Sequence, residues 1–149
     1  MAGLIDALAP HTTIGLDTSP FIYLFEQNPR YLALVETLFT HLKRPDVQGV
    51  TSVISLIETC VEPQRQGELA LVQTYERALL NSQQVDTLPI TPALAKRSIP
   101  LRIQYRLRVP DALQVAAALE RNATLFITND RQIRRVTEVS VLLPDDFVS

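Results

Sequence analysis

Residues 12–25 read TTIGLDTSPFIYLF, and the rest of the fold can be worked out from this stretch. Thr12–Leu16 is a short apolar run of the kind that forms a buried strand. The run stops at Asp17, after which Ser19 suits the N-cap of a helix and Pro20 suits its first position. A strand that leads at once into a helix predicts an α/β unit with an acid at the carboxyl end of the strand.

The same alternation of strands and helices continues to the end of the chain. Helices are expected over residues 20–25, 31–42, 52–61, 67–80, 92–107, 111–121 and 130–135, and further strands over 47–51, 84–90, 124–128 and 139–143. Pro63 is expected to end the third of these helices and Pro100 to kink the fifth. The alternation predicts a three-layer α/β/α sandwich with a central, mostly parallel sheet of four to five strands.

Length and composition indicate an ordinary globular protein. The 149 residues are 46% hydrophobic and 20% charged, which fits a single domain over 1–149 with residues 1–11 as an N-terminal extension. The chain has no run of apolar residues long enough for a membrane span. Asp6 interrupts the apolar start, so a cleaved signal peptide is not expected. Cys60 is the only cysteine, which excludes an internal disulfide and favours the cytoplasm.

The basic residues are concentrated in one part of the chain. Residues 1–95 hold five Lys/Arg and ten Asp/Glu, whereas residues 96–135 hold nine Lys/Arg and three Asp/Glu. These numbers give net charges of −5 and +6 for the two segments. The +6 segment is either a set of solvated helix faces or a surface that binds a polyanion.

Four acids occupy distinctive positions. Asp17 follows the first expected strand and Asp130 follows the fourth, with only Asn129 between. Glu58 lies in the helix after the second strand, and Asp111 begins the most apolar helix of the chain. Ligands of open α/β sheets bind at the carboxyl ends of the strands. Asp17 and Asp130 must lie at that edge, and the other two acids can reach it.

Each acid also has a simpler explanation. Asp17 and Asp130 are suitable helix caps, and Asp111 suits the first turn of a helix because of the helix dipole. Glu58 is harder to explain in this way, because ionised carboxylates are rarely placed among apolar side chains without a partner. Four neighbouring carboxylates repel one another unless they share protons or bind a cation, and Mg²⁺ or Mn²⁺ prefers oxygen ligands.

An acidic metal site beside a basic surface suits hydrolysis of a phosphodiester. His11 and His41 are far from every acid in the sequence, and the chain has neither a nucleophile elbow nor a phosphate-binding P-loop. An aspartate-nucleophile phosphatase usually has a second acid where this chain has Ser19. A receiver domain needs a lysine late in the chain, and none follows Lys96.

Four segments resemble PIN domains, and in particular the VapC-like toxins of bacterial and archaeal toxin–antitoxin pairs. They read GLDTSPFIYLFE (15–26), TSVISLIET (51–59), RLRVPDALQVAAAL (106–119) and LFITNDRQIRRV (125–136). Their order and spacing together carry the resemblance, which covers nearly all of the chain after residue 11. The chain departs from the usual pattern in the length of its first eleven residues and in Pro100.

This resemblance implies a metal-dependent endonuclease that cuts single-stranded RNA with Mg²⁺ or Mn²⁺. It implies that Asp17, Glu58, Asp111 and the more variable Asp130 are the catalytic and metal-binding acids. In similar proteins, the positions of Ser19 and of Thr128 or Asn129 help to orient the acids or the metal's water molecules. It also implies a homodimer and an antitoxin that inserts a basic side chain among the acids.

The leading hypothesis from the sequence is therefore a ribonuclease acting as the toxin of a toxin–antitoxin pair. Arg102, Arg106, Arg108 and Arg131 are expected to contact the RNA. The alternative is a non-catalytic RNA-binding or regulatory module on a PIN-like scaffold. The alternative predicts RNA binding that weakens with salt, without metal-dependent cleavage.

Overall fold

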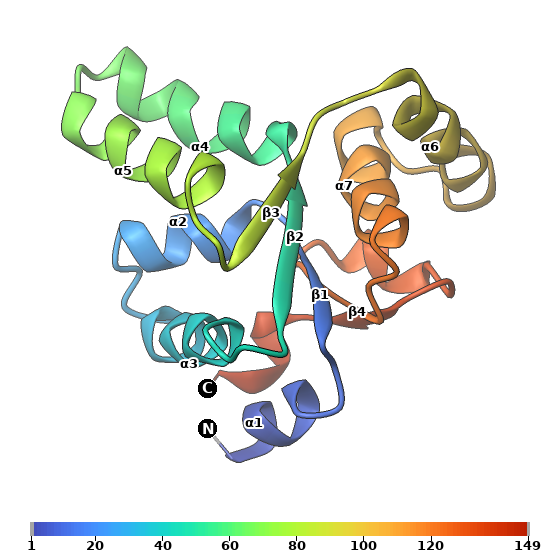
Figure 1. The fold of residues 1–149 in the computed structure, drawn as a ribbon, viewed down its shortest axis with the longest axis horizontal. Coiled ribbons are helices and arrows are strands. Elements are labelled where there is room, and N and C mark those ends of the chain that lie inside the picture. The colour runs from blue at the N-terminus through green and yellow to red at the C-terminus, as the bar shows by residue number, and fades with distance from the viewer. Residues whose placement is uncertain (1, 149) are drawn as a thin grey trace.

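The computed structural model describes residues 2–148, which form a central sheet with helices on both of its faces (Figure 1). The strands are β1 (Thr13–Leu16), β2 (Gln48–Ser52), β3 (Val85–Leu88), β4 (Leu125–Ile127) and β5 (Ser140–Leu142). The helices are α1 (Ala2–Leu8), α2 (Ser19–Phe25), α3 (Leu32–Leu42), α4 (Val53–Arg65), α5 (Leu69–Leu80), α6 (Pro92–Tyr105) and α7 (Val109–Glu120). Two short 3₁₀ helices, η1 (Arg131–Arg135) and η2 (Pro144–Phe147), complete the fold.

The sheet has five strands in the order β3-β2-β1-β4-β5, and every neighbouring pair is parallel. This arrangement confirms the expected three-layer α/β/α sandwich. The chain first builds the sheet outward from β1 through β2 to β3, and then crosses back to place β4 on the other side of β1. The strand order therefore reverses between β1 and β4, which is where ligands bind in sheets of this type.

Alternating side chains of the strands build two separate cores. Ile14 and Leu16 of β1 point into a core formed with α1, α2, α3 and α5. Gly15, between them, faces the opposite layer and lies against α7 and Phe126. That second core contains the buried face of α6 and five buried residues of α7, which are Ala112, Val115, Ala116, Ala117 and Ala118. Figure 1 shows these two groups of helices on opposite sides of the strands.

The N-terminal extension is part of the first core. Leu4 and Leu8 of α1 are fully buried and pack into the same cluster as Leu38 of α3. In Figure 1, α1 lies below α3 and close to the C-terminal end of the chain. The first helix therefore covers apolar surface at the end of the sheet opposite the carboxyl ends of the strands.

Several helix starts differ from the sequence expectation by one or two residues. Helix α7 begins at Val109 and not at Asp111, because Pro110 suits the first turn of a helix and does not break this one. Ser19 is the first helical residue of α2 and not its N-cap, which is Thr18. Thr18 does not cap the helix with its side chain, because its hydroxyl group donates to Glu58 instead. The helix expected from residue 67 starts at Leu69, since Gly67 has a positive φ of 75° that a helix cannot contain.

One of the two internal prolines has an effect different from that expected. The expectation that Pro63 ends its helix is wrong, because α4 continues to Arg65 with Pro63 buried inside it. A proline this close to the end of a helix removes only one backbone hydrogen bond, and α4 packs along α5. Helix α6 continues through Pro100 and ends at Tyr105, because Arg106 adopts a left-handed conformation with φ 55°.

None of the helices within residues 2–148 is both long enough and apolar enough to cross a membrane.

We predict that Gly15→Ala lowers the free energy of unfolding by about 1–3 kcal/mol, as overpacking of a well-packed core does. A Cβ atom at this position would lie 2.5 Å from Cβ of Ala118 and 2.7 Å from Cδ1 of Phe126. Urea denaturation followed by circular dichroism measures the change. Gly3→Ala is the matched control, because its Cβ would meet only Phe147, at 4.0 Å. Equal stability of the two variants would show that β1 and α7 are not in this close contact.

Candidate functional site

A pocket of about 330 Å³ lies at the carboxyl edge of the sheet, around the point where the strand order reverses. Side chains from the loop after β1, from α2, α4 and the start of α7, and from the segment after β4 line it. They are Asp17, Thr18, Ser19, Ile22, Glu58, Arg108, Asp111, Thr128, Asn129 and Asp130. The structure thus brings all four acids singled out in the sequence to one pocket, although they are up to 113 positions apart in the chain.

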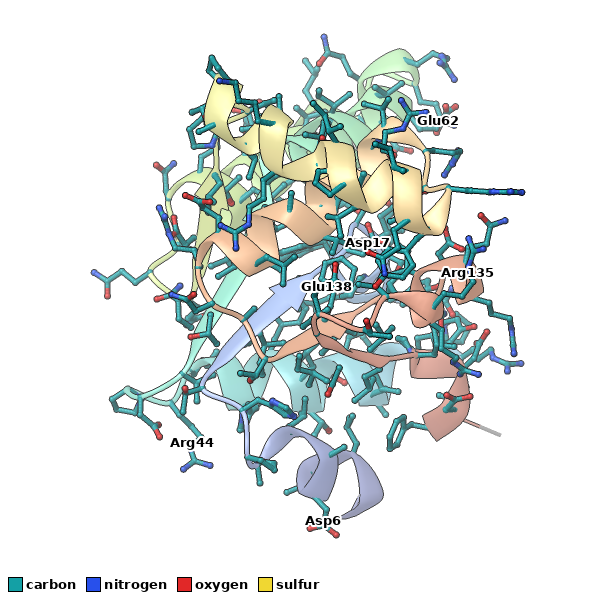
Figure 2. All side chains as sticks on the ribbon, turned by 90° about the vertical axis from the view of Figure 1, so that its right-hand side faces the viewer. Asp6, Asp17, Arg44, Glu62, Arg135 and Glu138 are labelled. Carbon is teal, nitrogen blue, oxygen red and sulfur yellow. The ribbon has the colours of Figure 1, made fainter. Side chains whose placement is uncertain are left out.

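Asp17 is the most enclosed of these acids and is held by hydrogen bonds from three directions. Its Oδ1 accepts from the backbone N–H of Thr18 at 2.8 Å, and its Oδ2 accepts from the hydroxyl of Thr128 at 2.6 Å. The amide of Gln114 lies 3.5 Å from Oδ1. Figure 2 shows Asp17 well inside the outline of the molecule, whereas Asp6 and Arg44 lie at its edge. Asp17 therefore has a fixed orientation and does not act as a conventional helix cap.

Glu58 is exposed, which corrects the expectation that it sits among buried apolar side chains. Helix α4 buries the face that carries Ser55, Thr59 and Pro63, so the neighbouring Ile57 is exposed as well. The carboxylate of Glu58 still faces the pocket, because its Oε1 accepts a hydrogen bond of 2.6 Å from the hydroxyl of Thr18. The same threonine thus contacts both Asp17 and Glu58.

Asp111 lies in the first turn of α7 and forms an ion pair with Arg108. The Nε atom of Arg108 is 3.1 Å from Oδ2 of Asp111. The two side chains differ strongly in environment, since Arg108 is 75% exposed and Asp111 only 13%. The first-turn position agrees with the helix-dipole explanation, but it also directs the carboxylate into the pocket beside the other acids.

Asp130 is the N-cap of η1, as the simpler explanation from the sequence proposed. Its Oδ1 accepts from the backbone N–H of Gln132 at 2.9 Å. Its own N–H donates to the hydroxyl of Thr128 at 3.0 Å. Because Thr128 also donates to Asp17, this threonine fixes the distance between the loop after β1 and the loop after β4.

Burial and the charges of neighbouring acids raise the pKa values of Asp17 and Asp111. Burial raises the pKa of Asp17 above its ordinary value, and the charge of Glu58 adds to the rise, while the hydrogen bonds from Thr128 and Thr18 oppose it. Burial also raises the pKa of Asp111, with further contributions from Asp17 and Asp130 and an opposing one from Arg108. Both carboxyls are therefore harder to ionise in the folded protein than in the unfolded chain.

Because these pKa values are raised, ionising Asp17 and Asp111 at neutral pH lowers the stability of the folded protein. A raised pKa means that the folded state holds the proton more tightly than the unfolded chain does. The contribution of such a group to stability is therefore present below the ordinary pKa of aspartate and is lost as the pH rises through the raised value. A bound cation would offset this loss, because it favours the ionised carboxylates.

A buried polar network beneath the acids was not identified from the sequence. Gln114 of α7 is 1% exposed, and its amide nitrogen donates to the hydroxyl of Ser55 at 2.8 Å and lies 3.4 Å from that of Thr18. Its amide oxygen accepts from the hydroxyl of Ser52 at 2.6 Å. In the sequence, this network is indicated by a single amide side chain, that of Gln114, within the otherwise apolar stretch ALQVAAAL of residues 112–119.

The three expected supporting residues have different surroundings. Thr128 is fully buried and contacts both Asp17 and Asp130 as described. Asn129 is directed away from the acids, because it donates to the hydroxyl of Tyr23 and accepts from the N–H of Asp145. The Ser19 hydroxyl oxygen is buried and has no hydrogen-bond partner among the residues that the structure describes.

Among the four arginines expected to bind a polyanion, only Arg108 lines the pocket. Arg102 donates through Nε to the backbone carbonyl of Leu107 and so supports the segment before α7. Arg106 is exposed at the C-terminal end of α6, and Arg131 is exposed at the start of η1. The roles of these three residues in substrate binding remain predictions.

The pocket fits a hard divalent cation in its chemistry. Its polar lining offers carboxylate and hydroxyl oxygens, which are the ligands that Mg²⁺ and Mn²⁺ take. The unpartnered hydroxyl of Ser19 is suited to hydrogen-bond a water molecule of such an ion. Within residues 2–148, however, no three Asp, Glu, His or Cys side chains come together closely enough to form a ready metal site. The four acids therefore line the same pocket, but in the described residues their carboxylates are not grouped closely enough to bind one ion together.

Comparison with known proteins gives a family match. The model of the PIN domain family matches residues 14–139, which span β1 to the start of β5 and include all four acids. No curated protein matches the sequence.

Several solved structures share the fold. A chain of a toxin–antitoxin complex from Klebsiella pneumoniae superimposes with a TM-score of 0.67 at 23% identity, covering 89% of this chain and 97% of that one. A chain of VapBC2 from Rickettsia felis, bound to a DNA fragment from its promoter, superimposes with a TM-score of 0.67 at 16% identity. The match covers 88% of this chain and 98% of that one. VapC20 of Mycobacterium tuberculosis, a toxin that cleaves the sarcin–ricin loop, superimposes with a TM-score of 0.66 at 17% identity. The match covers 85% of this chain and 98% of that one.

We predict that Gln114→Leu lowers the free energy of unfolding by about 1–3 kcal/mol, because it leaves buried hydroxyl groups without their amide partner. Gln104→Leu makes the same chemical change on the exposed face of α6 and is expected to stay within about 0.5 kcal/mol of the parent. Thermal and urea unfolding of both variants measure the difference. Equal effects of the two substitutions would contradict the network around Gln114.

Proposed function

This chain belongs to the PIN domain family, and we propose that it is a metal-dependent endoribonuclease that hydrolyses phosphodiester bonds of single-stranded RNA. The observation that carries the proposal is the gathering of Asp17, Glu58, Asp111 and Asp130 around one pocket at the reversal point of a parallel sheet. The burial of Asp17 and Asp111 beside other acids is costly for the fold, and a reaction that needs a bound cation explains why these carboxylates are placed there.

Asp17 and Asp111 are the best placed of the acids to hold the ion, with Glu58 and Asp130 completing the oxygen lining. A bound Mg²⁺ or Mn²⁺ would supply a Lewis acid for the phosphoryl oxygen and would activate a water molecule as the nucleophile. Thr128 and Thr18 hold Asp17 in one orientation through hydrogen bonds of 2.6 and 2.8 Å. Gln114 supports the same geometry from below through Ser55. These neighbours keep the reactive oxygens in fixed positions before substrate binds.

We predict that Asp17→Asn abolishes RNA cleavage. The parent protein is expected to cut a single-stranded RNA with Mg²⁺ or Mn²⁺ and to stop when EDTA removes the ion. The substitution removes the negative charge that holds the cation but keeps the size of the side chain. Product formation on a denaturing gel measures the effect, and we expect a loss of at least 100-fold, about the effect of removing a metal ligand or its support.

The stability of the same variant provides the control. Because burial raises the pKa of Asp17, Asp17→Asn is expected to unfold at pH 7 at a temperature no lower than the parent when divalent ions are absent. Full cleavage by this variant would contradict the site assignment. RNA binding by the parent without any metal-dependent cleavage would instead favour a non-catalytic RNA-binding module.

We further propose that the enzyme is the toxin of a toxin–antitoxin pair. The similarity in fold to chains from two toxin–antitoxin assemblies and to an RNA-cleaving toxin supports this role. The proposal includes a cytoplasmic location, where RNA and the antitoxin are present. It also includes a homodimer, which light scattering of the purified protein tests.

We predict that expression of the chain in a bacterial host arrests growth, because cleavage of cellular RNA stops translation. Asp17→Asn is expected to restore growth at equal protein level. Co-expression of the protein encoded by the adjacent gene is expected to restore growth in the presence of the active chain. Normal growth with an enzyme that cuts RNA in vitro would point to a housekeeping nuclease and against a toxin.

A further inference from the structure

Arg108 has an unusual position for an arginine. It is the N-cap residue of α7, a position favoured by Ser, Thr, Asp and Asn, and its side chain makes no capping hydrogen bond. The N-terminus of a helix carries partial positive charge, so a cation there is unfavourable. Helix stability therefore does not explain why this residue is an arginine.

The contacts of Arg108 lie on the side of the pocket. Its Nε is 3.1 Å from Oδ2 of Asp111, and it lines the same space as Asp17, Glu58 and Asp130. In this arrangement the guanidinium supplies the positive charge that Asp111 would otherwise take from a metal ion.

We propose that Arg108 is an exchangeable counter-ion of the site. It pairs with Asp111, releases this carboxylate when a divalent cation binds, and then contacts a backbone phosphate of the bound RNA. This inference rests on the proposed function, because it assigns a step of metal and RNA binding to one residue.

The exchange is physically reasonable because one member of the ion pair, the guanidinium of Arg108, is mostly exposed to solvent. Arg108 is 75% exposed, and exposed ion pairs contribute little to stability, so a divalent ion can displace the guanidinium. The released guanidinium stays tethered at the rim of the pocket by the backbone of residue 108. A guanidinium binds phosphate oxygens through two parallel N–H donors, which suits it to the backbone of RNA.

The neighbouring arginines do not share this arrangement. Arg102 uses its Nε for the carbonyl oxygen of Leu107, and Arg106 is absent from the residues that line the pocket. Arg106 is nevertheless only two positions from Arg108 and carries the same charge. It is therefore a matched control for the general effect of removing one positive charge from this segment.

The first test measures binding of Mn²⁺ alone, from the loss of the electron paramagnetic resonance signal of the free ion. We expect Arg108→Gln to bind Mn²⁺ about three- to tenfold more tightly than the parent, because a competing cation has been removed. Arg106→Gln is expected to stay within about twofold of the parent, since charges at an exposed site are screened. Circular dichroism confirms that both variants are folded.

Two outcomes of this test would overturn the inference. Unchanged or weaker Mn²⁺ binding by Arg108→Gln would show that the guanidinium does not compete with the ion. An equal gain in Arg106→Gln would show a general charge effect and no specific pairing with Asp111.

The second test measures RNA binding by fluorescence anisotropy in Mn²⁺ over a range of salt, with the RNA checked for integrity on a gel. Arg108→Gln is expected to lower the affinity several-fold and to reduce the slope of log affinity against log salt by about 0.7, the value for one phosphate contact with a single strand. An unchanged slope would overturn the phosphate role of Arg108.

The failure of this inference differs from the failure of the proposed function. If the parent binds no Mn²⁺ and cuts no RNA, the nuclease assignment fails and the inference fails with it. If the parent binds Mn²⁺ and cuts RNA while Arg108→Gln matches it in both binding measurements, only the role of Arg108 is wrong.

Discussion

The structure depends on the electrostatic cost of placing several carboxylates around one partly buried space. Asp17 and Asp111 are enclosed enough for burial to raise both pKa values, and the charges of neighbouring acids add to the rise, Glu58 for Asp17 and Asp17 and Asp130 for Asp111. Such a cluster persists in a folded protein only if hydrogen bonds, a basic group or a bound cation offset the repulsion. In the described residues the hydrogen bonds come from Thr18, Thr128 and Gln114, and the basic group is Arg108.

The apolar part of the fold keeps these groups in place. The strands β1 and β4 lie side by side with Leu16 opposite Ile127, so Asp17 emerges beside Thr128, which donates a hydrogen bond to it. Gly15 allows α7 to approach β1 closely, and this approach brings Gln114 and Asp111 to the edge of the sheet. Packing on both faces of the sheet therefore determines the geometry of a site that contains almost no apolar side chains.

The ion pair between Arg108 and Asp111 also explains how the same pocket is stable both without and with a bound cation. With Arg108 on Asp111, the metal-free protein limits the repulsion among its acids without needing an ion. With a cation present, the same arginine is free to act on a phosphate at the rim. In this view the +6 segment of the sequence contributes to function mainly through the one arginine that the fold directs into the pocket.

The sequence by itself determined the layered fold, because apolar runs alternating with helical patterns allow little else than a covered parallel sheet. It also singled out the four acids that line the pocket, starting from Asp17, which directly follows an expected strand, and Asp130, which follows another with only Asn129 between. Only the tertiary structure decided which face of α4 is buried, and hence that Glu58 is exposed and held by Thr18. Likewise, only the structure showed that Gln114 lies beneath Asp17, and that Arg108 pairs with Asp111 while Arg102 supports a loop. Such contacts depend on how helices rotate and cross when they pack, and a periodic pattern along one chain does not contain that information.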